Sequence, residues 1–153
     1  MSNAATSSPR WDPAFIADVI KAYDVRGLVD EQITVDFVRA VGQSFSRLMR
    51  SEGALSVVVA HDMRDSGPEL AEAFAEGVTE QGLNVINIGL ASTDEMYCAS
   101  GLLQVPGAMF TASHNPAAYN GIKLCRAGAR PVGQDTGLAT ISQELAEGVP
   151  ESN

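Results

Sequence analysis

The 153-residue chain lacks the features that mark membrane, nucleic-acid-binding or disulfide-rich proteins. No apolar run approaches the ~20 residues that are needed to cross a bilayer, and the polar first residues carry no secretory signal. Ten basic against nineteen acidic residues give a net charge of −9, whose field repels nucleic acids and anionic lipids. The only two cysteines, Cys98 and Cys125, are expected to be free thiols. These absences predict a cytoplasmic protein that binds neither nucleic acid nor membrane.

The length favours a single domain, which at this size buries roughly 70% of the surface of the unfolded chain. Residues 1–12 are mostly small and polar and are expected to be a disordered lead-in. Residues 13–148 are expected to form the domain, and residues 149–153 a polar tail without helix or strand.

Short apolar runs alternate with helical patterns along this domain. Continuous apolar or β-branched runs predict strands at 56–60, 84–88 and 107–111, and helices are expected to begin at Thr34, Ser66, Ser92 and about Asp135. Strands that alternate with helices at crossover distance imply right-handed βαβ units in a parallel sheet. A further strand at 121–125 is expected to be antiparallel. The pattern predicts an α/β three-layer sandwich with a short, mixed, mostly parallel sheet.

Polarity changes abruptly where the strand at 107–111 ends. Ser113, His114 and Asn115 follow, and Pro116 prevents the chain from winding directly into a helix. Asn120-Gly121 is then expected to form a turn that tolerates positive φ before the next strand. Upstream, Ser66 is expected to cap a helix through a Ser-x-x-Glu box. A reactive loop is therefore predicted at the end of a buried strand.

Ser113 is the candidate reactive group of this loop. A hydrolytic triad is disfavoured, because His114 is adjacent and points to the opposite side of an extended backbone. The Gly-x-Ser-x-Gly nucleophile elbow is also missing, since Thr111 and Asn115 occupy the glycine positions. A serine near donors such as Asn115 and Lys123 is better suited to carrying phosphate. The alternative is a polar turn in which Ser113 only caps backbone groups.

Other charged residues have two interpretations each. Arg26 beside Asp24 is either a surface ion pair or a phosphate ligand. Asp62 and Arg64 follow a buried strand, at the sheet edge where ligands collect, yet they could equally form a structural pair that fixes the loop. Arg126 is expected to be a solvated turn cation.

Three stretches together resemble one enzyme family. Thr111-Ala-Ser-His-Asn-Pro116 followed by Tyr119-Asn-Gly-Ile-Lys123 resembles the phosphoserine loop of the α-D-phosphohexomutases, the phosphoglucomutases and phosphomannomutases. Lys21–Gly27 and His61–Ser66 resemble further segments of the same family, in the same order. The resemblance extends from residue 21 to about residue 139 and implies the fold of the family's first domain.

The resemblance implies a reversible shift of phosphate between positions 1 and 6 of a hexose. Ser113 is then the phosphate carrier, and glucose 1,6-bisphosphate the activator and intermediate. His114 and Lys123 are expected to handle the protons of the reacting hydroxyls or to neutralise charge, and which of them is the base stays open. Arg26 is expected to contact phosphate.

The resemblance also assigns residues to the substrate and to the loop. Tyr23 is expected to border the sugar pocket, and Arg26, Asn115 and Lys123 are expected to bind the hexose phosphate. Loop support is expected from Asp62, Arg64, Asn120 and Gly121.

The chain departs from the family in what is missing. One Mg²⁺ is expected on an oxygen of phosphorylated Ser113, but the Asp-Gly-Asp-x-Asp metal loop does not occur. That loop and the sugar-selecting loops belong to domains II–IV, so glucose and mannose cannot be distinguished. The isolated chain is expected to be inactive and prone to self-association. A non-catalytic sugar-phosphate binding module is the alternative.

Overall fold

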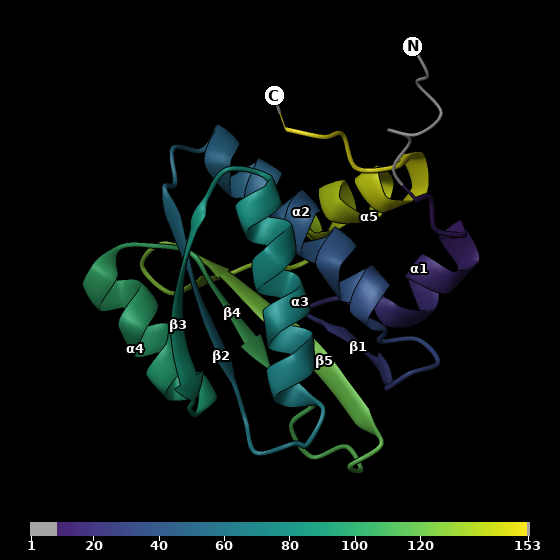
Figure 1. Ribbon diagram of the computed structural model, residues 1–153, viewed down its shortest axis with the longest axis horizontal. Helices are drawn as coiled ribbons and strands as arrows, with labels where there is room; N and C mark the ends of the chain where they lie inside the picture. Colours follow the sequence, from purple (N-terminus) through teal and green to yellow (C-terminus); the bar gives the residue numbers. More distant parts are fainter. Residues whose placement is uncertain (1–8, 153) are drawn as a thin grey trace.

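The computed structural model describes residues 9–152 and contains one six-stranded sheet in the order β1-β5-β4-β2-β3, with β6 beside β5 (Figure 1). The strands are β1 (Val25–Leu28), β2 (Ser56–His61), β3 (Asn84–Leu90), β4 (Gly107–Phe110), β5 (Tyr119–Arg126) and β6 (Arg130–Pro131). The helices are α1 (Pro13–Val19), α2 (Val35–Ser51), α3 (Gly67–Glu80), α4 (Thr93–Leu103) and α5 (Leu138–Glu147).

The strand directions confirm the predicted mixed sheet. β2 pairs in parallel with β3 and β4, whereas β5 pairs antiparallel with β1, β4 and β6. Within residues 9–152, β5 is thus the one strand that runs against the others. The sequence did not reveal that β1 would pair with β5, which lies far along the chain.

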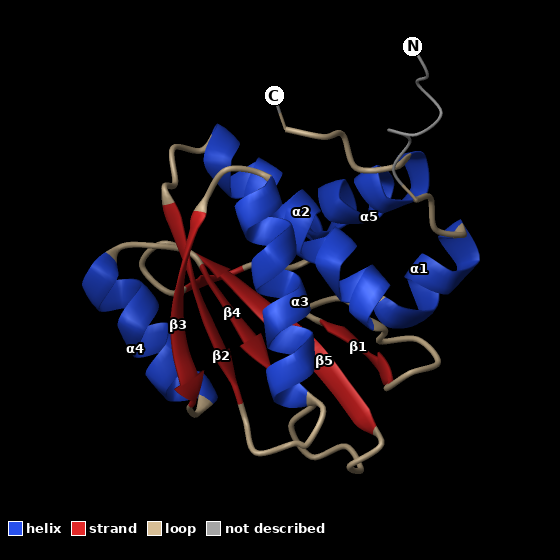
Figure 2. Ribbon diagram, in the orientation of Figure 1, coloured by secondary structure: helices blue, strands red, loops and turns tan. Residues whose placement is uncertain are grey.

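Helices cover both faces of the sheet and make three layers. Helices α1, α2, α3 and α5 share the larger hydrophobic cluster, and α4 packs on a smaller cluster across the sheet. Figure 2 shows α2 and α3 crossing in front of the strands, whereas α4 lies apart from them at the left. Val57 and Val59 face the larger cluster, and Val58 and Ala60 the smaller one. This two-sided burial explains why β2 is continuously apolar.

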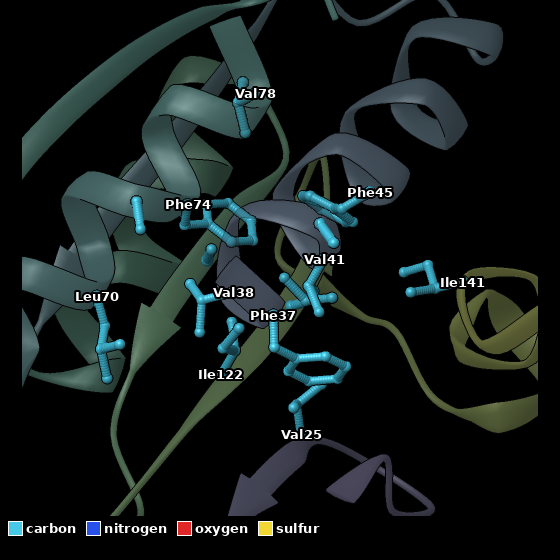
Figure 3. Close-up of a cluster of buried hydrophobic side chains, with 14 of the residues drawn as sticks. Val25, Phe37, Val38, Val41, Phe45, Leu70, Phe74, Val78, Ile122 and Ile141 are labelled. Atoms are coloured by element: carbon cyan, nitrogen blue, oxygen red, sulfur yellow. The ribbon is translucent and has the colours of Figure 1, made fainter. Parts of the chain in front are cut away.

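Aromatic and β-branched side chains from α2, α3 and the strands fill the larger cluster (Figure 3). Phe74 of α3 packs edge-on against Phe110 of β4, with ring centroids 5.5 Å apart, and is fully buried. Helix α2 begins as predicted, because Thr34 Oγ1 accepts a hydrogen bond from the Phe37 amide at 3.1 Å. Gly53, with a φ of 97°, follows its end.

Two local predictions are wrong. Ser66 makes no capping hydrogen bond; its hydroxyl accepts instead from the Asn120 amide nitrogen at 2.8 Å. Asn120 and Gly121 form no turn, because both lie inside β5 and neither has a positive φ. Gly121 is required for space: a Cβ there would lie 2.1 Å from the carbonyl oxygen of Val25 on β1.

The packed chain begins earlier than residue 13. Residues 1–8 of the expected lead-in lie outside the described residues, but Trp11 stacks on Phe15 and meets Phe37 edge-on, with centroids 5.9 and 5.1 Å away. Its amide donates to the carbonyl oxygen of Leu145. At the other end, Val149 is buried in the core although residues 148–152 form no helix or strand.

The segment before α5 and the cation on β5 differ from expectation. The helix expected from Asp135 begins as a 3₁₀ turn over Gln134–Thr136, and α5 starts only after Gly137, whose φ is 151°. Arg126 is not a solvated turn cation: its Nε and Nη2 donate to the two carboxylate oxygens of Glu52, both at 2.9 Å.

The predicted absence of a disulfide is confirmed. Cys98 is exposed on α4, Cys125 is buried in β5, and both are free. Among residues 9–152, no helix has the length and apolar character of a membrane span.

Candidate functional site

The loop that carries Ser113 lies at the carboxyl end of β4. In Figure 1 this loop and the one that follows β2 both lie at the lower edge of the sheet. Ser113 is exposed and has a φ of 53°, in the left-handed region that non-glycine residues seldom adopt. Its amide donates to Thr111 Oγ1 at 3.1 Å. The residue expected to react therefore has a left-handed backbone conformation, which the hydrogen bond to Thr111 stabilises.

Arg64, on the loop after β2, holds the Ser113 loop. Its guanidinium donates to four carbonyl oxygens, those of Ser113 (3.0 Å), Asn115 (2.8 Å), Pro116 (2.8 Å) and Tyr119 (2.9 Å). Asp62 accepts from the Arg64 amide at 3.0 Å, and its second oxygen lies 3.5 Å from Nε. Asp62 and Arg64 form the structural pair that was one of their two interpretations.

Arg26 connects β1 to the same loop. Its Nη1 donates to Asn115 Oδ1 at 2.8 Å, and its Nη2 lies 2.6 Å from the carboxylate of the buried Asp24. Its Nε is buried and has no hydrogen-bond partner in the described structure. The guanidinium, with 30% of the side chain exposed, thus bridges a buried carboxylate and the loop.

The pairing register places Arg26 and Lys123 on one face of the sheet. Arg26 is opposite Gly121, and Lys123 lies two residues further along β5. Cross-strand partners and residues two apart share a face. Lys123 is also opposite Met109, which packs in the α4 cluster. The two cations therefore lie on the α4 side of the sheet.

Other expected site residues make no side-chain hydrogen bond or ion pair with Ser113 in the described part of the chain. His114 is exposed beside it, and Lys123, which is half-buried, makes no ion pair among residues 9–152. Tyr23, 83% exposed, lines a separate hollow of about 360 Å³ with Pro131 and Gly133. The hollow at Ser113, about 330 Å³, is lined by Asp62, Met63, Arg64, Asp65, Asn115 and Ala117. The structure joins Ser113, Asn115, Arg26 and the Asp62–Arg64 pair.

Sequence reasoning missed two supports of the loop, the hydroxyls of Thr111 and Ser66. The third, the pairing of Arg26 with Asp24, was one of two interpretations. Thr111 orients the Ser113 amide, Asp24 anchors Arg26, and Ser66 accepts from Asn120, which is fully buried. A threonine two residues before a turn serine is a known local hydrogen-bonding pattern and could have been noticed. The bond between Ser66 and Asn120 joins residues 54 apart, so no local signal predicts it.

The described residues do not form a metal site by themselves. No group of three or more His, Cys, Asp or Glu side chains within residues 9–152 could hold a metal ion. Mg²⁺ takes six oxygen ligands in near-ideal octahedral geometry, and phosphorylated Ser113 could supply only part of that set.

The chain is similar to known proteins of one family. The family described as phosphoglucomutase/phosphomannomutase, alpha/beta/alpha domain I, matches residues 17–150. A phosphomannomutase from Vibrio cholerae is 42% identical over 130 residues, which cover 83% of this chain and 28% of that protein. A phosphomannomutase from Klebsiella pneumoniae is 41% identical over 128 residues, covering 83% of this chain and 79% of it.

A solved structure shows the same fold. The phosphoglucomutase/phosphomannomutase family protein from Burkholderia thailandensis aligns with a TM-score of 0.79 and 30% identity, over 89% of this chain and 30% of that one. The chain thus spans less than a third of the Vibrio and Burkholderia proteins. The match over residues 17–150 shows that the chain belongs to the phosphoglucomutase/phosphomannomutase family, as its α/β/α domain I.

Proposed function

We propose that this chain is the phosphate-carrying domain of a phosphohexomutase, with Ser113 as the carrier. The proposal rests mainly on one observation: Ser113 is exposed at the carboxyl end of β4, on a loop that two guanidinium groups hold. Phosphoryl transfer asks a protein mainly for alignment and for positive charge around the transferring group. A fixed loop with Arg26 and Lys123 on the neighbouring sheet face fits both needs.

In the proposed reaction, phosphorylated Ser113 donates its phosphoryl group to a hydroxyl of a hexose phosphate. The bond between phosphorus and Ser113 Oγ breaks as the sugar oxygen bonds to phosphorus. The proton of the sugar hydroxyl passes to a base, and Oγ takes up a proton. The resulting hexose 1,6-bisphosphate then reverses its orientation in the site and returns its other phosphate to Ser113. The net change moves phosphate between positions 1 and 6 of the sugar.

Two residues could move these protons. His114 is adjacent to Ser113 and exposed, and Lys123 lies on the same face as Arg26 without an ion pair in the described part of the chain. A general base must come within hydrogen-bond reach of the proton, directly or through one water. A movement of the loop when substrate binds would bring His114 or Lys123 within this reach, and we propose both as proton carriers. We also propose that Tyr23 forms part of the sugar site.

Mg²⁺ would neutralise charge on the transferring group if it bound phosphorylated Ser113. The described residues contain no group of three or more His, Cys, Asp or Glu side chains for a metal ion, so we propose that water molecules and carboxylates of a further domain complete its coordination. We accordingly propose that this chain alone turns over hexose phosphates slowly or not at all.

Phosphorylation of Ser113 can be tested on the chain itself. Repeated turnover by this chain alone is expected to be slow, but the test needs only a single transfer. Prolonged incubation with glucose 1,6-bisphosphate is expected to add one phosphoryl group, which intact-mass analysis detects and peptide mapping assigns to Ser113. Ser113→Ala should abolish the gain. Ser51→Ala is a matched control, because Ser51 is an exposed serine at the end of α2 whose hydroxyl donates to Leu48.

The outcome also separates the competing function. If the chain binds hexose phosphates equally well with Ser113→Ala and never gains phosphate, it is a binding module and the mutase proposal is wrong. Phosphate gained equally by wild type and Ser113→Ala would place the carrier elsewhere.

A further inference from the structure

Arg64 occupies an unusual position: its guanidinium fills the inner side of the Ser113 loop, and only 10% of its side chain is exposed. We propose that Arg64 is a positioning residue that turns the peptide groups of this loop so that their amide N–H groups face outward, which makes the loop a binding site for a phosphate group. The biological use of such a site rests on the proposed phosphoserine function. Its existence can be tested without it.

The inner side of the loop is defined by carbonyl oxygens. Arg64 Nη1 donates to Pro116 and Tyr119, and Nη2 donates to Ser113 and Asn115. The guanidinium is planar and presents its donors in a fixed fork, so it holds these carbonyls in one arrangement. Each carbonyl directs the negative end of its peptide dipole toward Arg64.

The outer side follows from the geometry of the peptide unit. In a planar trans peptide, the N–H of the next residue points opposite to the carbonyl. The carbonyls of Ser113 and Pro116 point at Arg64, so the N–H groups of His114 and Ala117 point away from it. Within residues 9–152 neither N–H donates a hydrogen bond. Two donors beside Ser113 are thus available to an anion.

Backbone N–H donors would let this acidic protein bind an anion in spite of the negative charge around the site. The chain carries a net charge of −9, and Asp62 and Asp65 line the hollow at Ser113. Asp62 is paired with Arg64, which offsets its charge. The outward N–H groups of His114 and Ala117 each present a partial positive charge on the outer side of the loop. They belong to the same loop, although they are not successive along the chain. Arg64 thus contributes to phosphate binding from behind the loop, without touching the phosphate.

The test is a titration of the ¹⁵N-labelled, unphosphorylated chain with inorganic phosphate, followed by NMR. The amide signals of His114 and Ala117 are expected to shift with a common dissociation constant. Arg64→Lys keeps the charge but loses the fork, and is expected to weaken phosphate binding roughly tenfold. That is the factor expected if the competent loop conformation falls to about a tenth of the molecules.

Arg126→Lys is the matched control. Arg126 is also mostly buried, with 17% of its side chain exposed, and donates to Glu52 and to the Thr136 carbonyl far along the sheet from Ser113. Its substitution should leave phosphate binding unchanged. If Arg64→Lys weakened phosphate binding only by destabilising the whole fold, Arg126→Lys would be expected to weaken it to a similar degree.

Two results would overturn the inference. One is a folded Arg64→Lys variant that binds phosphate as tightly as wild type. The other is a wild-type titration in which the His114 and Ala117 amides do not shift, and this result counts whether or not the variant folds. Because inorganic phosphate needs no reaction at Ser113, a failure of phosphoryl transfer would refute the proposed function and leave this inference intact.

Discussion

Replacing Gly121 with alanine is expected to force β1 and β5 apart. An alanine Cβ would lie 2.1 Å from the carbonyl oxygen of Val25, and 3.1 Å from both the Arg26 Cα and the Thr111 carbonyl oxygen. All three neighbours are backbone atoms, so no side-chain rotation can relieve the contact. The closest distance is more than 1 Å short of ordinary van der Waals contact, about 3.4 Å. The strands must therefore move.

The cost can be estimated from the contacts at risk. β1 is joined to the sheet through β5 at four registered pairs, with Gly121 opposite Arg26 in their middle. Overpacking and lost strand pairing of this kind cost roughly 2–4 kcal/mol of unfolding free energy. At about 3 °C per kcal/mol for a chain of this size, Tm should fall by about 6–12 °C. Urea and thermal unfolding followed by circular dichroism measure both quantities.

Gly101→Ala is the matched control for this experiment. Gly101 lies inside α4, and an added Cβ would meet nothing within 4 Å. Because alanine favours a helix over glycine, this substitution should stabilise the protein by about 0.5–1 kcal/mol. A Gly121→Ala variant within about 0.5 kcal/mol of wild type would show that β1 and β5 can separate cheaply, and the explanation of this glycine would be wrong.

Two further predictions concern Glu52 and the cysteines. The hydrogen bond from Arg126 lowers the pKa of Glu52 below its ordinary 4.5, so the pair stabilises the fold above that pH and the gain is lost as pH falls through the lowered pKa. Glu52→Gln should therefore cost less than about 1 kcal/mol at pH 7 in urea unfolding and still less at pH 3, and equal costs at both would contradict this. Burial raises the pKa of Cys125, whereas Cys98 is exposed, so a thiol reagent should modify only Cys98 in the native protein and both thiols in denaturant. Fast native modification of Cys125 would refute this.

Patterns within single segments predicted much of the fold. The apolar run of β2 predicted a strand buried on both faces, and Thr34 and Ser92 cap α2 and α4 as expected. Each of these depends on residues a few positions apart, where periodicity and capping chemistry act directly.

Contacts between distant segments were not predictable in the same way. Gly121 suggested a turn because glycine tolerates positive φ, but its real constraint is the approach of Val25 from another strand. Ser66 had the spacing of a capping box, yet its hydroxyl accepts a hydrogen bond from the Asn120 side chain instead of capping the helix. In both cases a tertiary contact overrode a local preference.

The candidate site shows the same division. The exposed position of Ser113 after a buried strand could be predicted from the change in polarity. The convergence of Arg64 on four carbonyls of the loop could not, because backbone acceptors leave no trace in the sequence. The proton-transfer roles of His114 and Lys123 and the place of Tyr23 in the sugar pocket stay predictions.

The antiparallel pairing of β1 with β5 has a consequence for how the protein is made. Arg26 and Asn115 are 89 positions apart in the sequence. Most of the domain must therefore have emerged from the ribosome before the hydrogen bond between them can form. Contacts of such long range are slow to establish during folding, whereas the β2-α3-β3 region can assemble from neighbouring segments. We therefore expect β1 to remain unpaired on nascent chains that stop before Tyr119.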